Sequence, residues 1–98
     1  MHAAALSDGV ALLHTAYDVA RHSAVDRAIG LGVKADAGLH ELGLVLTARV
    51  SGAIALKCGR AGIGWVASRS VATTLAHEIA DAYGITVIER APREARSA

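Results

Sequence analysis

Two short apolar runs flank a polar turn at the start of the chain. The runs are His2–Leu6 and Val10–Ala16, and Ser7-Asp8-Gly9 lies between them. An Asp-Gly pair between two apolar runs is typical of a β-hairpin, because glycine readily adopts the positive φ of tight hairpin turns. The pattern therefore predicts an N-terminal hairpin.

The remaining apolar positions alternate between helical and strand-like spacing. Apolar residues recur three and four positions apart in the expected helices, as at Ile54, Cys58 and Ala61 or at Val71, Leu75, Ile79 and Ala82. In chain order, the pattern predicts a helix over about 19–32 capped by Asp18, a loop over Ala35–Gly43, a strand at Leu44–Thr47, a helix from Ser51 to Gly62, a strand at Trp65–Ala67, a helix from Ser70 to Gly84 and a strand at Ile85–Ile88.

Strands that alternate with helices through short connections favour right-handed crossovers and a parallel core. The predicted fold is therefore α/β, a three-layer sandwich with a mixed sheet in which the hairpin precedes a βαβαβ unit. Residues 1–90 are expected to form one domain. Residues 91–98 have no apolar pattern and are expected to be a mobile tail.

Composition and charge narrow the class of protein. The chain has 98 residues, of which 53% are hydrophobic, and it has no Phe, so small side chains must build the core. A net charge of +1 with scattered basic residues excludes the basic surface of a nucleic-acid binder. Because so small a core gives a monomer only marginal stability, we expect a homodimer that pairs through Ala3–Ala16.

Cysteine and histidine usage points to a protein without disulfides or metal. Cys58 is the one cysteine, and its helical spacing with Ile54 predicts a buried structural thiol. The five histidines lack metal-ligand spacing, so no zinc is expected. The chain has neither a signal-peptide pattern nor an apolar run of membrane-spanning length, which favours the cytoplasm.

Each expected helix start carries an arginine and a hydroxyl group. The pairs are Arg21 with Ser23, Arg49 with Ser51, and Arg69 with Ser68 and Ser70. Helix N-termini at the carboxyl ends of strands bind anions, and the planar guanidinium fits phosphate oxygens. A phosphate or pyrophosphate is the chemically natural ligand, and ordinary serine capping beside a solvated arginine is the alternative.

Two further residues allow a functional and a structural interpretation. His22 precedes Asp26 by one helical turn, so the carboxylate either orients the ring as a general acid in a small nucleotide-binding enzyme or forms a helix-surface pair. Trp65 either stacks on a base or fills a core that is poor in large side chains.

Several ordered motifs resemble one protein family. Residues 17–27, Tyr-Asp-Val-Ala-Arg-His-Ser-Ala-Val-Asp-Arg, are similar to the signature Glu-Asp-Val-Gly-Arg-His-Asn-Ala-Val-Asp-Lys of the formate dehydrogenase accessory sulfurtransferases, the FdhD/NarQ family. Residues 2–6, 47–51, 68–76 and 84–87 resemble further segments of that family in the same order. The resemblance covers about residues 2–90.

The resemblance implies a cytidine-deaminase-like α/β fold and a role in molybdenum cofactor maturation. Members of the family pass sulfur from a cysteine desulfurase to the guanylated molybdopterin cofactor that formate dehydrogenase requires. Such a cofactor, or a guanine nucleotide, would bind where the motif positions gather. Those positions are His2, Arg21, His22, Asp26, Arg49, Ser51 and Ser70.

The chain departs from the family in ways that shape the leading hypothesis. The paired-cysteine loop credited with sulfur transfer is missing, and Ala20 and Ala48 stand where the family has glycine. We expect a truncated, cytoplasmic FdhD-like protein that retains the cofactor-pocket half of the fold and has no assigned catalytic residue. Its expected partners are a second copy, a cysteine desulfurase, formate dehydrogenase or a separate cysteine-bearing chain. The alternative is a noncatalytic interaction module or partner subunit with a decayed pocket.

Overall fold

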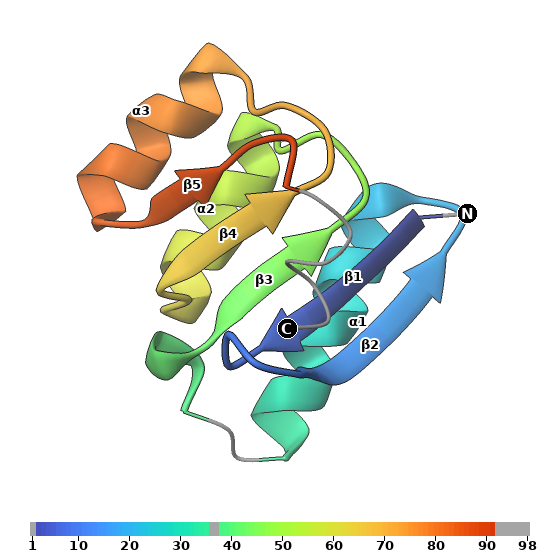
Figure 1. The fold of residues 1–98 in the computed structure, drawn as a ribbon. Coiled ribbons are helices and arrows are strands. Elements are labelled where there is room, and N and C mark those ends of the chain that lie inside the picture. Colours follow the sequence, from blue (N-terminus) through green and yellow to red (C-terminus); the bar gives the residue numbers. More distant parts are fainter. Residues whose placement is uncertain (1, 36–37, 92–98) are drawn as a thin grey trace.

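A computed structural model of the chain describes residues 2–35 and 38–91. These residues form one sheet and three α-helices (Figure 1). The elements in chain order are β1 (His2–Ser7), β2 (Leu12–Asp18), α1 (Arg21–Lys34), the 3-10 helix η1 (Leu39–Glu41), β3 (Gly43–Leu46), α2 (Gly52–Ala61), β4 (Trp65–Ser68), α3 (Thr74–Tyr83) and β5 (Thr86–Ile88).

The five strands form one mixed sheet in the order β2-β1-β3-β4-β5. Strand β1 is antiparallel to both of its neighbours, whereas β3, β4 and β5 are parallel to one another. The predicted α/β fold, with a mixed sheet and an N-terminal hairpin before a βαβαβ unit, is confirmed. Asp8 stabilises the turn between β1 and β2, because its Oδ1 accepts the N–H groups of Ala11 and Val10. These two hydrogen bonds lower the pKa of Asp8.

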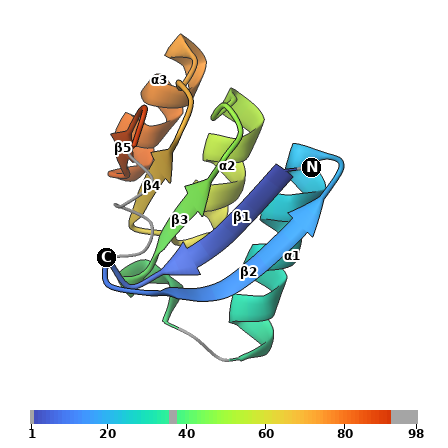
Figure 2. The same cartoon turned by 45° about the vertical axis from the view of Figure 1, so that its right-hand side comes forward.

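All three helices lie on the same face of the sheet (Figures 1 and 2). The crossovers β2-α1-β3, β3-α2-β4 and β4-α3-β5 each join parallel strands, and each advances toward β5. Right-handed crossovers that advance in one direction put their helices on one face. The described residues therefore make two layers of the three that the pattern predicts, and the second face of the sheet carries no described helix.

The core lies between that sheet face and the helices. Alternate residues of a strand point to one face, so Leu6, Leu44 and Val66 share the helix side. They pack in one cluster with the buried faces of the helices, including Ile54 of α2. Most of the other buried positions are alanine, which lets the helices approach the sheet closely. These small residues are Ala4, Ala16, Ala24, Ala28, Ala48, Ala55, Ala76 and Ala80.

Helix α1 begins two residues later than the sequence predicts. Asp18 ends β2, and its Oδ1 accepts the N–H of Ala20, so the expectation that Asp18 caps the helix is wrong. Ala20 is the residue before the first turn, and its side chain has no capping oxygen. The strand register with β1 keeps Asp18 extended, since it pairs with His2.

Helix α2 confirms its predicted ends, whereas α3 does not begin where expected. Ser51 Oγ accepts the N–H of Ile54, and Gly62 ends α2 in the left-handed conformation. Ser70 does not cap α3, because it lies in a bend after β4, and backbone hydrogen bonds hold residues 71–73 beside Val50. Thr73 caps that helix through its Oγ1, and the buried positions move to Ala76 and Ala80.

The folded domain extends one residue beyond its predicted C-terminal end. The N–H of Ala91 donates to the carbonyl of Ser68, and Ala91 is buried, so this residue belongs to the folded domain and not to the expected tail. Residues 92–98, the remainder of that tail, lie outside the described residues. Each helix in the described ranges is too short or too polar to serve as a membrane span.

Trp65 does not fill the core between sheet and helices. It shares a sheet face with its register partner Gly43. The next residue of the strand, Val66, faces the helices. The indole ring covers Gly43 so closely that a β-carbon there would overlap it. The helix-free face therefore carries the one tryptophan of the sequence.

Gly43→Ala is expected to destabilise the protein by about 1–3 kcal/mol, because the new methyl group would displace the Trp65 ring. Gly30→Ala is the matched control. Gly30 lies in α1 with no atom near the added β-carbon, so alanine should raise stability by up to about 1 kcal/mol. Urea unfolding followed by tryptophan fluorescence measures both changes. Equal effects of the two substitutions would contradict this account of Trp65.

Candidate functional site

The fold gathers most of the predicted anion-binding residues at one edge of the sheet. The parallel strands β3, β4 and β5 end at this edge, which we call the carboxyl edge, and antiparallel β1 begins there. Since β2 also ends there, α1 and α2 both start at it. His2, Arg21, Arg49, Ser51 and Ser70 therefore lie at or directly after the carboxyl edge.

Backbone hydrogen bonds join the two segments that follow β3 and β4. The N–H of Val50 donates to the carbonyl of Val71 at 3.0 Å, and the N–H of Thr73 donates to the carbonyl of Val50 at 3.0 Å. Together these bonds form a parallel bridge between Val50 and Ala72. Arg49 and Ser51 therefore lie on a segment that is bonded directly to the segment of Ser70.

Ser68 is the buried link between these segments. Its Oγ donates to the carbonyl of Ala48 at 2.6 Å and accepts the N–H of Ser70 at 2.9 Å. The carbonyl of Ser70 also accepts the N–H of Arg90 at 2.7 Å, so the backbone of Ser70 is fixed on both sides. The sequence places Ser68 beside Arg69 but does not show that it is buried, because its partner Ala48 is distant in the sequence.

Thr47 ties the start of β1 to the end of β3. Its N–H donates to the carbonyl of Ala3 at 3.1 Å, and its Oγ1 accepts the N–H of Ala3 at 3.1 Å. His2 is thereby held next to the segment that leads to Arg49.

Arg21 has a buried hydrogen-bond donor at the carboxyl edge. It is the first residue of α1, and its Nε is buried without a hydrogen-bond partner among the described residues. A buried donor without an acceptor is costly, so such a group often marks the place of a ligand or water. Ser51, by contrast, uses its hydroxyl as the cap of α2, as the alternative interpretation holds.

Asp26 has a partner other than the expected His22. Its Oδ1 accepts a hydrogen bond from Nζ of Lys57 at 2.7 Å, which links α1 to α2. His22 remains half-buried in the first turn of α1, nearer the carboxyl edge. The paired histidine and aspartate of the enzyme hypothesis are therefore not formed. Within the described ranges, His, Cys, Asp and Glu side chains do not cluster in a way that would hold a metal ion.

Glu89 is a residue of this edge that the sequence reasoning missed. Its Oε2 accepts the N–H of Ala72, and its Oε1 lies 2.9 Å from Nε2 of His77. The bond from Ala72, followed by the contact with His77, lowers the pKa of Glu89. Its position directly after the last parallel strand is the signal that would have identified it.

Comparison with known proteins decides the family. A sequence model of the FdhD/NarQ family matches residues 1–97. The chain belongs to the FdhD/NarQ family. The sulfur carrier proteins FdhD of two Staphylococcus aureus strains, MRSA252 and JH9, are 33% and 32% identical to it over 88 residues.

These alignments cover 90% of this chain and 33% of each relative, so the chain spans about a third of the length of these FdhD proteins. A crystal structure of a putative formate dehydrogenase accessory protein from Desulfotalea psychrophila has the same fold. The TM-score is 0.86 with 28% identity, over 93% of this chain and 39% of the other. The family expected from the motifs is confirmed.

Because the FdhD relatives are named sulfur carriers, the position of the thiol matters. Cys58 is fully buried between α2 and the sheet, as its spacing predicts. Burial raises the pKa of this thiol to about 12. The thiolate is the reactive form, so Cys58 is a structural residue in the folded chain.

Cys58 is expected to make the folded state less stable at alkaline pH. An unfolded thiol ionises near pH 9.0 and the folded one near 12, so stability is full below pH 9 and falls between those values by up to about 1.4 kcal/mol per pH unit. Urea unfolding from pH 8 to 11 measures the slope, and Cys58→Ala should flatten it. Rapid reaction of native Cys58 with a thiol reagent at pH 8 would contradict a buried thiol.

Glu89→Gln is expected to change the acid side of the stability profile. The lowered pKa of Glu89 means that its contribution is present above about pH 4.5 and disappears as the pH falls through the lowered value. Between about pH 5 and 3, the melting temperature of Glu89→Gln should fall less than that of the parent. Glu78→Gln, an exposed change on α3, is the control. Identical profiles for parent and Glu89→Gln would refute the role of this carboxylate.

Proposed function

We propose that the carboxyl edge binds the diphosphate and guanine nucleotide portion of a guanylated molybdopterin cofactor, as one step in the maturation of formate dehydrogenase. The observation that carries this proposal is the buried Nε of Arg21, which has no acceptor among the described residues. Membership in the FdhD/NarQ family and the formate dehydrogenase accessory neighbour agree with that role.

The donors at this edge suit an anionic ligand. Arg21 offers a buried N–H at the first turn of α1, where the helix dipole also favours negative charge. Arg49 is exposed beside the first turn of α2, so its guanidinium is free to meet a second phosphate oxygen. His2 and Ser70 border the same edge. The N–H of Ala3, next to His2, donates to Thr47 Oγ1, and the N–H of Ser70 donates to Ser68 Oγ.

The remaining predicted positions have supporting roles in this proposal. His22 lies in the first turn of α1 beside Arg21, and Ser51 caps α2. Asp26 links α1 to α2 through its hydrogen bond with Lys57. When bound, the cofactor itself would supply the metal centre that receives sulfur.

The sulfur is proposed to arrive on a thiol outside these 98 residues. Cys58 is the one cysteine in them, and burial with a raised pKa makes it a poor persulfide carrier. A cysteine desulfurase would be the donor, and formate dehydrogenase would be the destination of the finished cofactor. This chain would then contribute recognition of the cofactor and not the transfer chemistry.

GDP is the simplest probe of the proposed site. We expect it to raise the melting temperature and, at 100 times its dissociation constant, to add about 2.7 kcal/mol to the free energy of unfolding. Arg21→Ala and Arg49→Ala should each weaken binding by about tenfold or more, because each removes a charged donor. Isothermal titration calorimetry measures the affinities.

Arg60→Ala is the matched control, because Arg60 is an exposed arginine in the last turn of α2, at the opposite edge of the sheet. It should leave the GDP affinity unchanged. If neither GDP nor pyrophosphate shifts the melting temperature of the folded protein, the proposed site is refuted and the noncatalytic interaction module is favoured. Equal losses in Arg49→Ala and Arg60→Ala would indicate unspecific attraction.

A further inference from the structure

Strand β2 is an edge strand whose outer backbone groups point away from the sheet. In β1, the backbone of Ala3 bonds toward β3, so the alternate residue Ala4 bonds toward β2 and its partner Ala16. Thr15 and Tyr17 of β2 therefore direct their N–H and C=O groups away from the sheet. The carbonyl of Tyr17 already accepts an outside donor, Nη1 of Arg27 at 3.1 Å.

Large apolar side chains collect around this open edge. Soluble proteins rarely expose a contiguous group of such residues unless it contacts a partner. Five of them, on β2, its two flanks and the groove-facing side of α1, are at least 42% exposed. They are Val10, Leu13, Tyr17, Val19 and Leu31.

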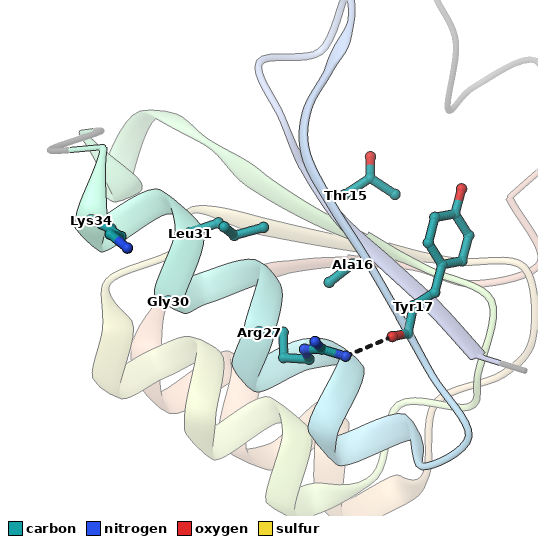
Figure 3. A pocket seen from close by; sticks show the side chains of 7 residues that line it. All are labelled: Thr15, Ala16, Tyr17, Arg27, Gly30, Leu31 and Lys34. Atoms are coloured by element: carbon teal, nitrogen blue, oxygen red, sulfur yellow. Dashed lines mark hydrogen bonds between the residues drawn. The ribbon is translucent and has the colours of Figure 1, made fainter.

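A groove of about 430 Å³ runs between β2 and α1 on this side. Arg27, Gly30, Leu31 and Lys34 line it from the helix, and β2 forms its other wall (Figure 3). The Ala16 side chain points toward α1, whereas the side chains of its neighbours on β2 point away from the helix. The groove is therefore open along the same edge that offers free backbone groups.

We propose that β2 and this groove bind an extended acidic segment of a partner protein, which adds to the sheet as a further strand. Its backbone would pair with Thr15 and Tyr17, as in other cases of strand addition to an exposed edge. Side chains of a strand alternate between faces, so every second residue of the segment would enter the groove. The residues between them would lie beside Tyr17 on the helix-free face.

Charge selects the residues that enter the groove. Its lining, in the part of the chain that the structure describes, includes the cations Arg27 and Lys34 and no carboxylate. Asp18 approaches Nη1 of Arg27 at 3.4 Å but lies at the end of β2, outside the lining. Aspartate or glutamate at the alternate positions would therefore meet the ammonium group of Lys34 and the guanidinium of Arg27, which Asp18 approaches from one end only. Apolar residues between them would match Tyr17.

A second copy of this chain fits the groove less well. Pairing of two β2 strands about a twofold axis would set the α1 helices side by side. Arg27 and Lys34 of each copy would then face those of the other, and like charges repel. The homodimer expected from the sequence stays a prediction, and its use of this groove is one outcome of the test.

Gly30 offers a way to close the groove without disturbing the fold. It is exposed on α1, and a β-carbon added there meets no atom within 4 Å. Gly30→Leu should therefore fill the groove and leave the melting temperature at or above that of the parent. Ala53→Leu, at an exposed position of α2, is the matched control.

The probe is a fluorescein-labelled heptapeptide of alternating valine and glutamate, and the same peptide with lysine in place of glutamate is its counterpart. Fluorescence anisotropy should show that the glutamate peptide binds at least about tenfold more tightly than the lysine peptide. Gly30→Leu and Lys34→Glu should each weaken binding of the glutamate peptide by at least about tenfold, whereas Ala53→Leu and Arg60→Glu should not.

Three results would overturn the proposal. They are absence of binding by the glutamate peptide, equal binding of both peptides, and binding that Gly30→Leu leaves unchanged. If sedimentation shows a dimer that Gly30→Leu converts to a monomer, the groove belongs to a second copy. GDP affinity, measured on the same variants, should not change, because the groove lies along β2 and not at the carboxyl edge.

Discussion

The arrangement of this domain depends on the direction of its three crossovers. Each joins parallel strands, each is right-handed, and each advances across the sheet toward β5. One consequence is that all three helices cover one face and leave the other without a described helix (Figure 2). Another is that α1, α2 and α3 all start near the edge where β3, β4 and β5 end, which is where polar residues gather.

Close packing on that single face requires small side chains. A β-carbon at Gly52 would come within 2.7 Å of Leu75, which shows how near α3 lies to α2. The same constraint explains the thiol of Cys58, a small side chain that fits against the sheet and is thereby removed from solvent. Packing and chemistry are linked here, because burial of Cys58 raises its pKa and disfavours the thiolate, which is the form that sulfur transfer needs.

Polar and charged residues gather at two separate places, the carboxyl edge and the groove beside β2. At the edge, the buried hydroxyl of Ser68 and the bridge at Val50 join loops that are far apart in the sequence. Along β2, Arg27 and Lys34 line a groove beside the outward-facing backbone of Thr15 and Tyr17. In our two proposals the first place binds a phosphate and the second binds a strand of a partner protein, so one FdhD-type domain would bind both ligands at separate places.

The sequence by itself determined the local structure and the family. Strand and helix periodicity, the Asp-Gly turn, the cap at Ser51 and the stops at Gly62 and Gly84 depend on neighbours within a few residues, so they could be read from the chain. The ordered motifs likewise indicated the FdhD/NarQ family, and spacing alone predicted that Cys58 is buried. The placement of Arg21, Arg49 and Ser70 near one edge followed from strand order once an α/β sheet was assumed.

Tertiary structure decided what depends on partners distant in the sequence. Residues 71–73 could have belonged to the first turn of a helix, but hydrogen bonds to Val50 hold them beside it, and the helix is capped by Thr73. Asp26 could have paired with His22 one turn away, yet Lys57 of another helix takes its carboxylate. Trp65 faces the side without helices because register with β3 sets its direction. In each case a contact across the sheet or between helices outweighs a local preference worth about 1 kcal/mol or less, and such contacts exist only after the chain has folded.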